Sequence, residues 1–274
     1  EDALAVAYQD TFGFNVFPYQ AIFLDASGLL GGAETSRFQA ALAATGYRPD
    51  PETIDDHIGE ELAFLGFLCG AEADALRDGL EATAGQLRLR QADFLADHLL
   101  RWLAPFAAAM ARTAAPFYAA LSELTVDAVA DHVEHLAVKA EAIPPVGVTL
   151  HLDDDTTDLR TIVDYLLQPS NSGIYLARAD LIRLGRAFDL PRGFGDRPQM
   201  FINLLRAAAT YDEFTALSAR LAEEAEDYQA RYAKLAHDHP ALDPWLHGWQ
   251  RQAAATADLL RTGAAMAAID PSGS

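Results

Sequence analysis

The chain has 274 residues, of which 51% are hydrophobic and 22% charged, and its formal net charge at pH 7 is −20. This composition is typical of a folded globular protein and excludes a disordered chain. The acidic balance argues against nucleic-acid binding, which requires clustered Lys and Arg, and fits either a basic partner or a simply soluble surface. The longest apolar runs are too short to cross a bilayer, so we expect no membrane insertion.

The first strong helical pattern begins near Thr53. Apolar residues then recur at helical spacing through Ile58, Leu62 and Cys69. Thr53 is a suitable N-cap, and Asp56 stands three residues later in the capping-box position. Cys69 is the single cysteine of the chain; it lies on the apolar face, so we interpret it as a core residue in a reducing compartment.

Residues 94–110 predict a further helix or a pair of helices, with Pro105 as a kink or break. Residues 117–142 predict one long helix or two. The stretch AIPPVGVTLHLDDDTTD at 142–158 contains a Pro pair, a Gly and three consecutive Asp residues, which is typical of a linker with a short extended piece.

Helical patterns return after this linker, and β-branched alternation is almost absent from the chain. The sequence therefore predicts an all-α protein in two helical parts, residues 1–142 and 159–268, joined by the linker 143–158. The later helices are expected at 159–168, 178–188, 199–209, 213–237 and 244–267.

Motifs for catalysis or metal binding are weak. HExxH is absent, and no histidine has an acidic residue three positions before it, as a di-iron carboxylate bundle requires. His132 and His135 form a potential ligand pair beside Asp131 but lack a third ligand, so a solvated polar face is favoured over a metal. We predict no catalytic residue, metal or cofactor. A metal- or nucleotide-dependent helical enzyme that uses His57, His132 and His135 stays an alternative.

An acidic cluster precedes the apolar run of the first helix. Asp55 and Asp56 stand directly before His57 in the stretch PETIDDHIGEELAFLGFLCG, residues 51–70. Such a cluster can serve catalysis, bind a metal, cap a helix or bind a basic partner, and its spacing alone does not choose among these roles.

A series of motifs in the first half resembles a known family. FPYQAIFLD (17–25) is followed by a Gly-rich turn, a short helix ending in TGY (45–47), DDHIGEELAFLGFL (55–68), ADFLADHLLRWLAPFAAAM (92–110) and FYAALSEL (117–124). This order is similar to the TorD/DmsD/NarJ-type chaperones, which mature molybdenum-containing redox enzymes. The resemblance covers about residues 7–140 and implies an all-α helical bundle of the TorD-like chaperone type with an additional C-terminal helical part. It also implies that helices preceding Glu1 are missing from this sequence.

The signature string of the family, E-P-x-D-H, is only partly kept. In the five residues from Thr53 to His57 the Asp-His pair matches, while the Glu and Pro positions do not. The Pro-aromatic element of the family matches Pro18 and Tyr19.

The resemblance implies a cytoplasmic chaperone that binds the twin-arginine signal peptide or the apo-form of a molybdoenzyme catalytic subunit. Members of this family have no established catalytic role, and a stable subunit of a redox complex is a further alternative. Carboxylates accept bidentate hydrogen bonds from guanidinium groups. On this basis Asp55, Asp56, His57 and Glu60 are expected to bind the arginines, with Pro18 and Tyr19 forming an apolar wall.

Overall fold

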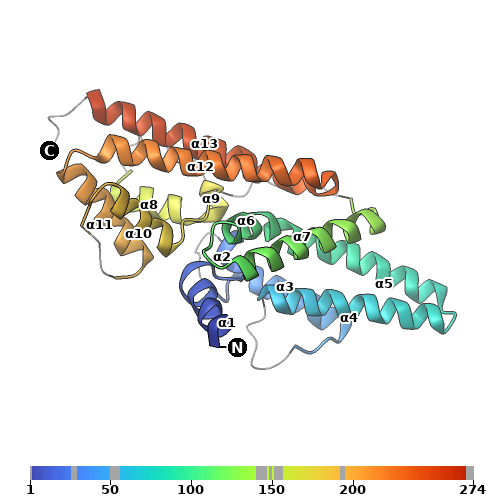
Figure 1. Ribbon diagram of the computed structural model, residues 1–274. Helices are drawn as coiled ribbons and strands as arrows, with labels where there is room; N and C mark the ends of the chain where they lie inside the picture. Colours follow the sequence, from blue (N-terminus) through green and yellow to red (C-terminus); the bar gives the residue numbers. More distant parts are fainter. Residues whose placement is uncertain are drawn as a thin grey trace.

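The computed structural model describes residues 2–25, 30–49, 56–139, 147, 150, 157–191 and 195–269. Every regular element in these ranges is a helix, and the only strand-like pairing among them is an isolated antiparallel bridge between Tyr19 and His57 (Figure 1). The all-α prediction is confirmed. No helix in the described part of the chain is long and apolar enough to cross a membrane.

The first part of the chain begins with short elements and continues with longer helices. They are α1 (Asp2–Tyr8), the π-helix η1 (Gln9–Asn15), α2 (Gln20–Leu24), α3 (Ala33–Thr45), α4 (Ile58–Arg77), α5 (Glu81–Phe94), the π-helix η2 (Leu95–Leu99), α6 (Leu100–Met110) and α7 (Pro116–Leu136).

The second part ends in a long helical hairpin, which lies along the upper edge of the molecule in Figure 1. Its elements are α8 (Leu159–Leu167), α9 (Pro169–Ser172), α10 (Arg178–Ala187), α11 (Arg197–Thr210), α12 (Phe214–Asp238), the 3-10 turn η3 (Pro240–Leu242) and α13 (Asp243–Ile269). The helices expected in this part are confirmed, each within a few residues of its predicted ends.

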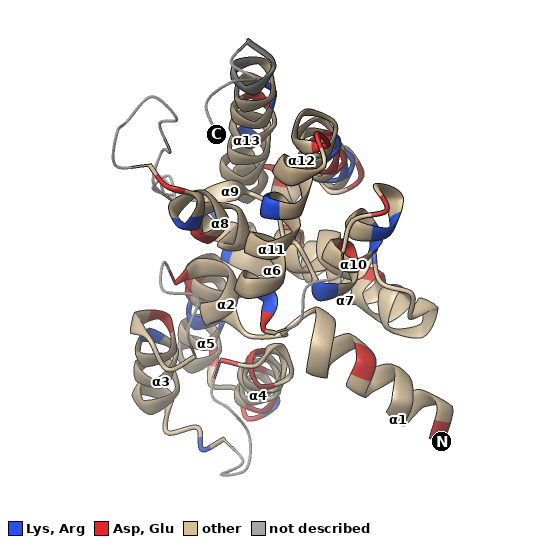
Figure 2. Ribbon diagram, turned by 90° about the vertical axis from the view of Figure 1, so that its left-hand side faces the viewer, with Lys and Arg blue, Asp and Glu red and all other residues tan. Residues whose placement is uncertain are grey.

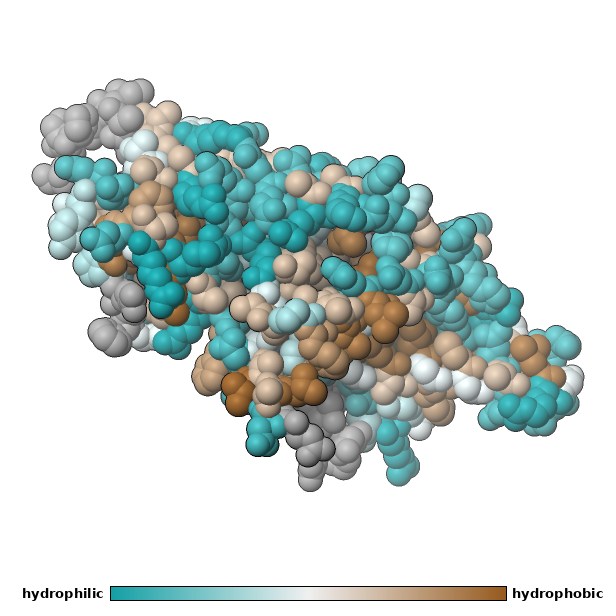
Figure 3. Space-filling model, viewed as in Figure 1, coloured by the Kyte–Doolittle hydropathy of each residue, from teal (hydrophilic) through white to brown (hydrophobic). Residues whose placement is uncertain are grey.

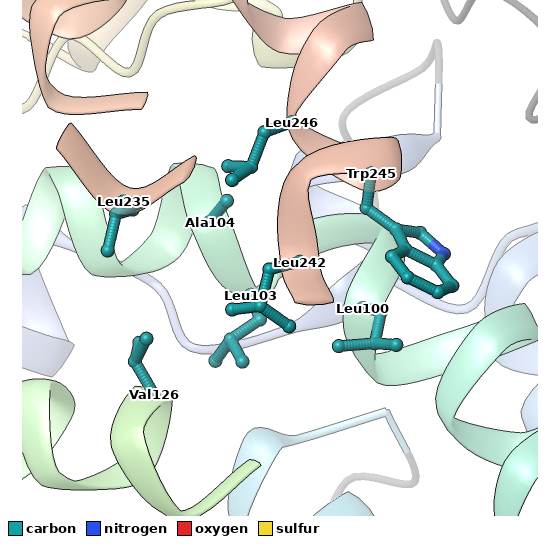
Figure 4. A pocket seen from close by; sticks show the side chains of 8 residues that line it. All are labelled: Leu100, Leu103, Ala104, Val126, Leu235, Leu242, Trp245 and Leu246. Atoms are coloured by element: carbon teal, nitrogen blue, oxygen red, sulfur yellow. The ribbon is translucent and has the colours of Figure 1, made fainter. Parts of the chain in front are cut away.

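Helix α6 lies at the centre of the fold because it is apolar on almost every side. Only Arg101 and Ala107 of its residues are not fully buried, and it contacts α2, α7, α12 and α13. Figure 4 shows the apolar side chains that meet where α6, α7 and the α12–α13 turn come together. They leave a cavity of only about 10 Å³, which is too small for a ligand.

Pro105 neither ends nor breaks α6, although the sequence predicts a kink or break there. A proline inside a helix cannot donate to the carbonyl four residues earlier, which here is Arg101. The indole Nε1 of Trp249 in α13 donates to that carbonyl at 3.1 Å. The missing backbone hydrogen bond is thus replaced by one that joins the two parts of the chain.

The two predicted parts share one hydrophobic core. The ring of Tyr175, between α9 and α10, stacks on Phe23 of α2 with centroids 5.2 Å apart. At the end of α6, Arg112 forms ion pairs with Asp180 and Glu224 of α10 and α12. Most of the predicted linker lies outside the described residues, so the division into domains stays a prediction.

Candidate functional site

The Pro-Tyr and Asp-His pairs, which are far apart in the sequence, lie side by side in the structure. The backbone N–H of Gln20 donates to the Asp56 carbonyl, and that of Ile58 donates to the Pro18 carbonyl, both at 2.9 Å. The rings of Tyr19 and His57 meet edge to face, with centroids 5.2 Å apart. We call this pair of half-buried rings the Tyr19–His57 element.

His57 is the N-cap of α4. Its backbone is extended, and its Nδ1 accepts a hydrogen bond from the N–H of Gly59 at 2.9 Å. The prediction that this helix starts at Thr53 with Asp56 in a capping box is wrong. Because residue 56 is paired with Gln20, it cannot also form a helical turn, and the helix begins at Ile58. Thr53 itself lies outside the described residues.

Asp56 binds a different helix from the one it precedes. Its Oδ2 accepts hydrogen bonds from the N–H of Ala21 at 2.8 Å and from the Thr35 hydroxyl at 3.1 Å. The side chain is fully buried. Because the first N–H groups of a helix have no intrahelical partner, this carboxylate satisfies α2 and also connects it to α3.

Two further carboxylates are buried in the first turn of α4. Glu61 is completely buried, and both of its oxygens lie 3.2 Å from the indole Nε1 of Trp102. Burial raises the pKa of Glu61 well above its ordinary value, so this side chain is held neutral. Glu60 is buried too, and burial together with a hydrogen bond to Glu60 raises the pKa of Tyr47 to about 12. We call Asp56, Glu60 and Glu61 the buried acidic cluster.

An ion pair lies beside this cluster and connects three helices. The guanidinium of Arg101 in α6 binds both carboxylate oxygens of Glu34 in α3, at 2.5 and 3.1 Å. Gln20 of α2 donates to the same carboxylate at 2.8 Å. Burial alone would raise the pKa of Glu34, but the hydrogen bond and charge of Arg101 outweigh it and the pKa is lowered. Glu34 is therefore ionised and already paired.

The Tyr19–His57 element combines partial exposure with a nearby negative charge. Burial lowers the pKa of His57, against the opposing effect of Asp56, so the ring is neutral at pH 7. Burial, the neighbouring Tyr8 and the charge of Asp56 raise the pKa of Tyr19. A cation that stacks on these rings would feel the charge of Asp56 without being repelled by a charged imidazole.

The structure brings together five of the six residues predicted for the site. Tyr19 and His57 are half-buried, whereas Pro18, Asp56 and Glu60 are buried, and Asp55 lies outside the described residues. In this conformation an arginine cannot reach the Asp56 carboxylate directly. Sequence reasoning missed Thr35, Trp102 and Arg101 as partners of these acids, because their contacts join helices far apart in the chain.

The histidines considered for an enzyme do not form one site. His132 Nε2 of α7 lies 2.9 Å from Gln91 Oε1 and 3.7 Å from the Sγ atom of Cys69. Cys69 lies in the middle of α4. His57 caps the start of that helix, roughly 16 Å away along its axis. Among the described residues no group of three or more His, Cys, Asp or Glu side chains could hold a metal ion.

Two larger clefts lie apart from the predicted site. One, of about 380 Å³, is formed by α6, α7 and α12. Its lining residues include Asp127 and His239, whose Oδ1 and Nε2 atoms lie 3.2 Å apart. The other, of about 230 Å³, lies between η1, α6, α10 and α12 and contains the paired Arg112. Neither includes a residue of the Tyr19–His57 element.

Comparisons with known proteins match the first part of the chain. The family model for the nitrate reductase delta subunit matches residues 1–108. The chlorate reductase assembly chaperone protein of Ideonella dechloratans is 46% identical over 57 residues, which is 21% of this chain and 28% of that protein. No solved structure matches the chain. The comparisons therefore confirm that residues 1–108 resemble the NarJ- and TorD-type chaperone family.

Proposed function

We propose that this protein is a cytoplasmic assembly chaperone for a molybdenum-containing redox enzyme and has no catalytic activity of its own. It binds the apo-form of the catalytic subunit, including a twin-arginine signal peptide, and assists cofactor insertion before export. The match of residues 1–108 to the delta-subunit family supports this proposal. A relative whose name states that it assembles chlorate reductase supports it further.

The Tyr19–His57 element is the proposed contact for the arginines. One guanidinium stacks on the Tyr19 ring, a contact worth roughly 0.5–2 kcal/mol. The neutral His57 ring forms the other wall, and Pro18 holds the backbone beneath them through its carbonyl. Asp56 acts as a positioning residue, because its side chain connects α2 and α3 while its charge reaches both rings. Glu60 supports the same helix start from inside.

Copurification from the native host tests the function. Mass spectrometry should identify a molybdoenzyme catalytic subunit, bound more tightly before the cofactor is inserted than after. Recovery of the mature, cofactor-loaded enzyme with this chain in equal amounts would instead indicate a stable subunit. Stoichiometric metal on this chain alone would indicate an enzyme.

Peptide binding tests the site. A labelled signal peptide from the copurified subunit should lose at least fivefold in affinity with Tyr19→Ala, measured by fluorescence anisotropy. Tyr211→Ala is the matched control, because Tyr211 is an exposed tyrosine at the α11–α12 turn. His57→Asn removes the imidazole but keeps a good N-cap residue, so it separates recognition from helix capping. Unchanged affinity in both Tyr19→Ala and His57→Asn would refute the site.

A further inference from the structure

Exposed apolar side chains gather on one face of the molecule, over α1, η1 and the first half of α7. Figure 3 shows this as a brown and tan area that extends from the N-terminal helix onto α7. Single exposed apolar residues are normal, but a contiguous group marks an interaction site. We call this group the α1/α7 surface; its members are Leu4, Val6, Tyr8, Phe14, Phe117, Leu121 and Leu124.

Helix α7 has two apolar faces, and only one belongs to the core. Val126, Val129 and Val133 are buried against the rest of the fold. Phe117, Leu121 and Leu124 recur at helical spacing on the opposite side. Leu124 is 63% exposed. The second face therefore contributes nothing to the core of the described residues.

Helix α1 extends this face. None of its residues is buried, and Val6 is 69% exposed. The Tyr118 hydroxyl of α7 donates to the Leu4 carbonyl at 3.2 Å, and the Tyr118 ring contacts those of Tyr8 and Phe12. These contacts join α1 and η1 to the start of α7, so their exposed side chains form one surface.

The charges on these helices are all of one sign. Residues 2–15 and 116–136 contain no Lys or Arg. In Figure 2 the N-terminal helix likewise carries red and no blue. The acidic residues of the two segments are Asp2, Asp10, Glu123, Asp127, Asp131 and Glu134.

This combination of charge and exposed apolar area selects one kind of partner. Nucleic acids and anionic membranes require basic residues on the protein. A second copy packed through the same surface would bring acidic residues against acidic residues, which is unfavourable. A partner segment with apolar side chains on one side and Lys or Arg beside them would satisfy both features.

We propose that the α1/α7 surface docks a basic amphipathic helix of a partner protein. The apolar face of that helix covers Leu121, Leu124 and Val6, and its basic residues lie against the acidic residues of α7. This inference goes beyond the proposed function, because it requires neither a signal peptide nor a twin arginine. It shares no residue with the Tyr19–His57 element, although Tyr8 lies close enough to Tyr19 to raise its pKa.

The test uses a synthetic helical peptide of leucines and lysines, with a matched peptide in which glutamate replaces every lysine. Fluorescence anisotropy should detect binding of the basic peptide only. Leu124→Asp should weaken that binding at least tenfold, and Val6→Asp at least threefold. Both changes add negative charge, which by itself would strengthen binding of a basic peptide, so a loss reports the apolar contact.

Leu89→Asp is the control, because Leu89 on α5 is 57% exposed, nearly as much as Leu124. It should leave the affinity within twofold of wild type. Circular dichroism melting checks that each variant is folded. Equal affinities of Leu124→Asp and Leu89→Asp for the basic peptide, or equal binding of the two peptides, would overturn the proposal.

The same variants separate this inference from the signal-peptide site. Tyr19→Ala should leave binding of the leucine-lysine peptide within threefold of wild type. If the signal peptide fails to bind while the leucine-lysine peptide still depends on Leu124, the proposed signal-peptide function fails and this inference stands. If Tyr19→Ala abolishes binding of both peptides and Leu124→Asp affects neither, this inference fails and the signal-peptide site stands.

Discussion

The start of α4 and the α1/α7 surface both combine acidic residues with apolar ones, but they use them in opposite ways. In the buried acidic cluster, Asp56 satisfies the N-terminus of α2, and Glu61 is held neutral against Trp102. On the α1/α7 surface the apolar side chains are exposed, and the acids Asp2, Asp10, Asp131 and Glu134 are exposed beside them. The same composition therefore stabilises the fold in one region and is available to a partner in the other.

Removing an acid of the buried acidic cluster should cause a large loss of stability, unlike removing an exposed acid. Asp56→Ala leaves the N–H of Ala21 and the Thr35 hydroxyl without their acceptor, which should lower the free energy of unfolding by about 2–4 kcal/mol. Asp74→Ala, at an exposed position of α4, should change the free energy of unfolding little. Urea unfolding measures both. Equal effects of the two substitutions would mean that Asp56 is no more important for stability than an exposed acid.

The free energy of unfolding should depend on pH through His98, which is buried near the Glu34–Arg101 ion pair. Burial and the charge of Arg37 lower its pKa to about 4, with Arg101 acting in the same direction and Asp97 and Glu34 opposing. Because the unfolded chain takes up this proton near pH 6.5, stability should fall as the pH falls from 6.5 to 4, by at most about 3 kcal/mol. His98→Gln should flatten the fall. An unchanged pH profile in urea unfolding would contradict this expectation.

Glu61 should act with the opposite sign. Its folded-state pKa is raised, so its contribution to stability is complete below about pH 4.5 and is lost as the pH rises toward the folded-state pKa. Glu61→Gln removes this titration and keeps an acceptor for Trp102. Relative to wild type, the variant should become steadily more stable as the pH rises from 4.5 to 7, because only the wild type must keep a proton on Glu61 or bury its charge. Thermal melting of both proteins over this range measures the gain, and a constant difference would show that Glu61 is ionised in the fold.

The smallest effect is expected on the exposed side of the comparison. Asp131→Asn should leave the melting temperature unchanged, because this residue is exposed. It should weaken binding of the leucine-lysine peptide about two- to threefold at low salt, and the difference should vanish at high salt because exposed charges are screened. A lower melting temperature with unchanged binding would mean that Asp131 stabilises the fold, as the buried acidic cluster does, and does not contact the partner.

The sequence was sufficient for most of the fold. The helices α8 and α10–α13 follow from apolar periodicity. Local rules misplaced the start of α4, because the backbone of Asp56 pairs with Gln20 and a capping box considers only neighbours in the chain. The continuous helix through Pro105 could not be predicted either, since the indole N–H that donates to the Arg101 carbonyl belongs to Trp249 of α13.

The site was predictable only in part. Pro18 and Tyr19, which the resemblance groups with Asp56 and His57, lie beside them in the structure. The burial of Asp56 and Glu60 depends on α2 and α3 packing over them, which no local pattern contains. The spacing of Phe117, Leu121 and Leu124 is visible in the sequence, but only the packing of α7 establishes that this face is the exposed one.

The central claim is that the exposed elements bind the client, whereas the buried acids stabilise the fold. Hydrogen exchange of the copurified chaperone–client complex, compared with the free chaperone, tests this claim most directly. We expect new protection in residues 2–24 and 116–136. The change should be clear in α1, because this helix has no buried residue to protect it in the free protein. We expect unchanged exchange in α12 and α13. Protection confined to α12 and α13, with none in residues 2–24 or 116–136, would contradict the claim.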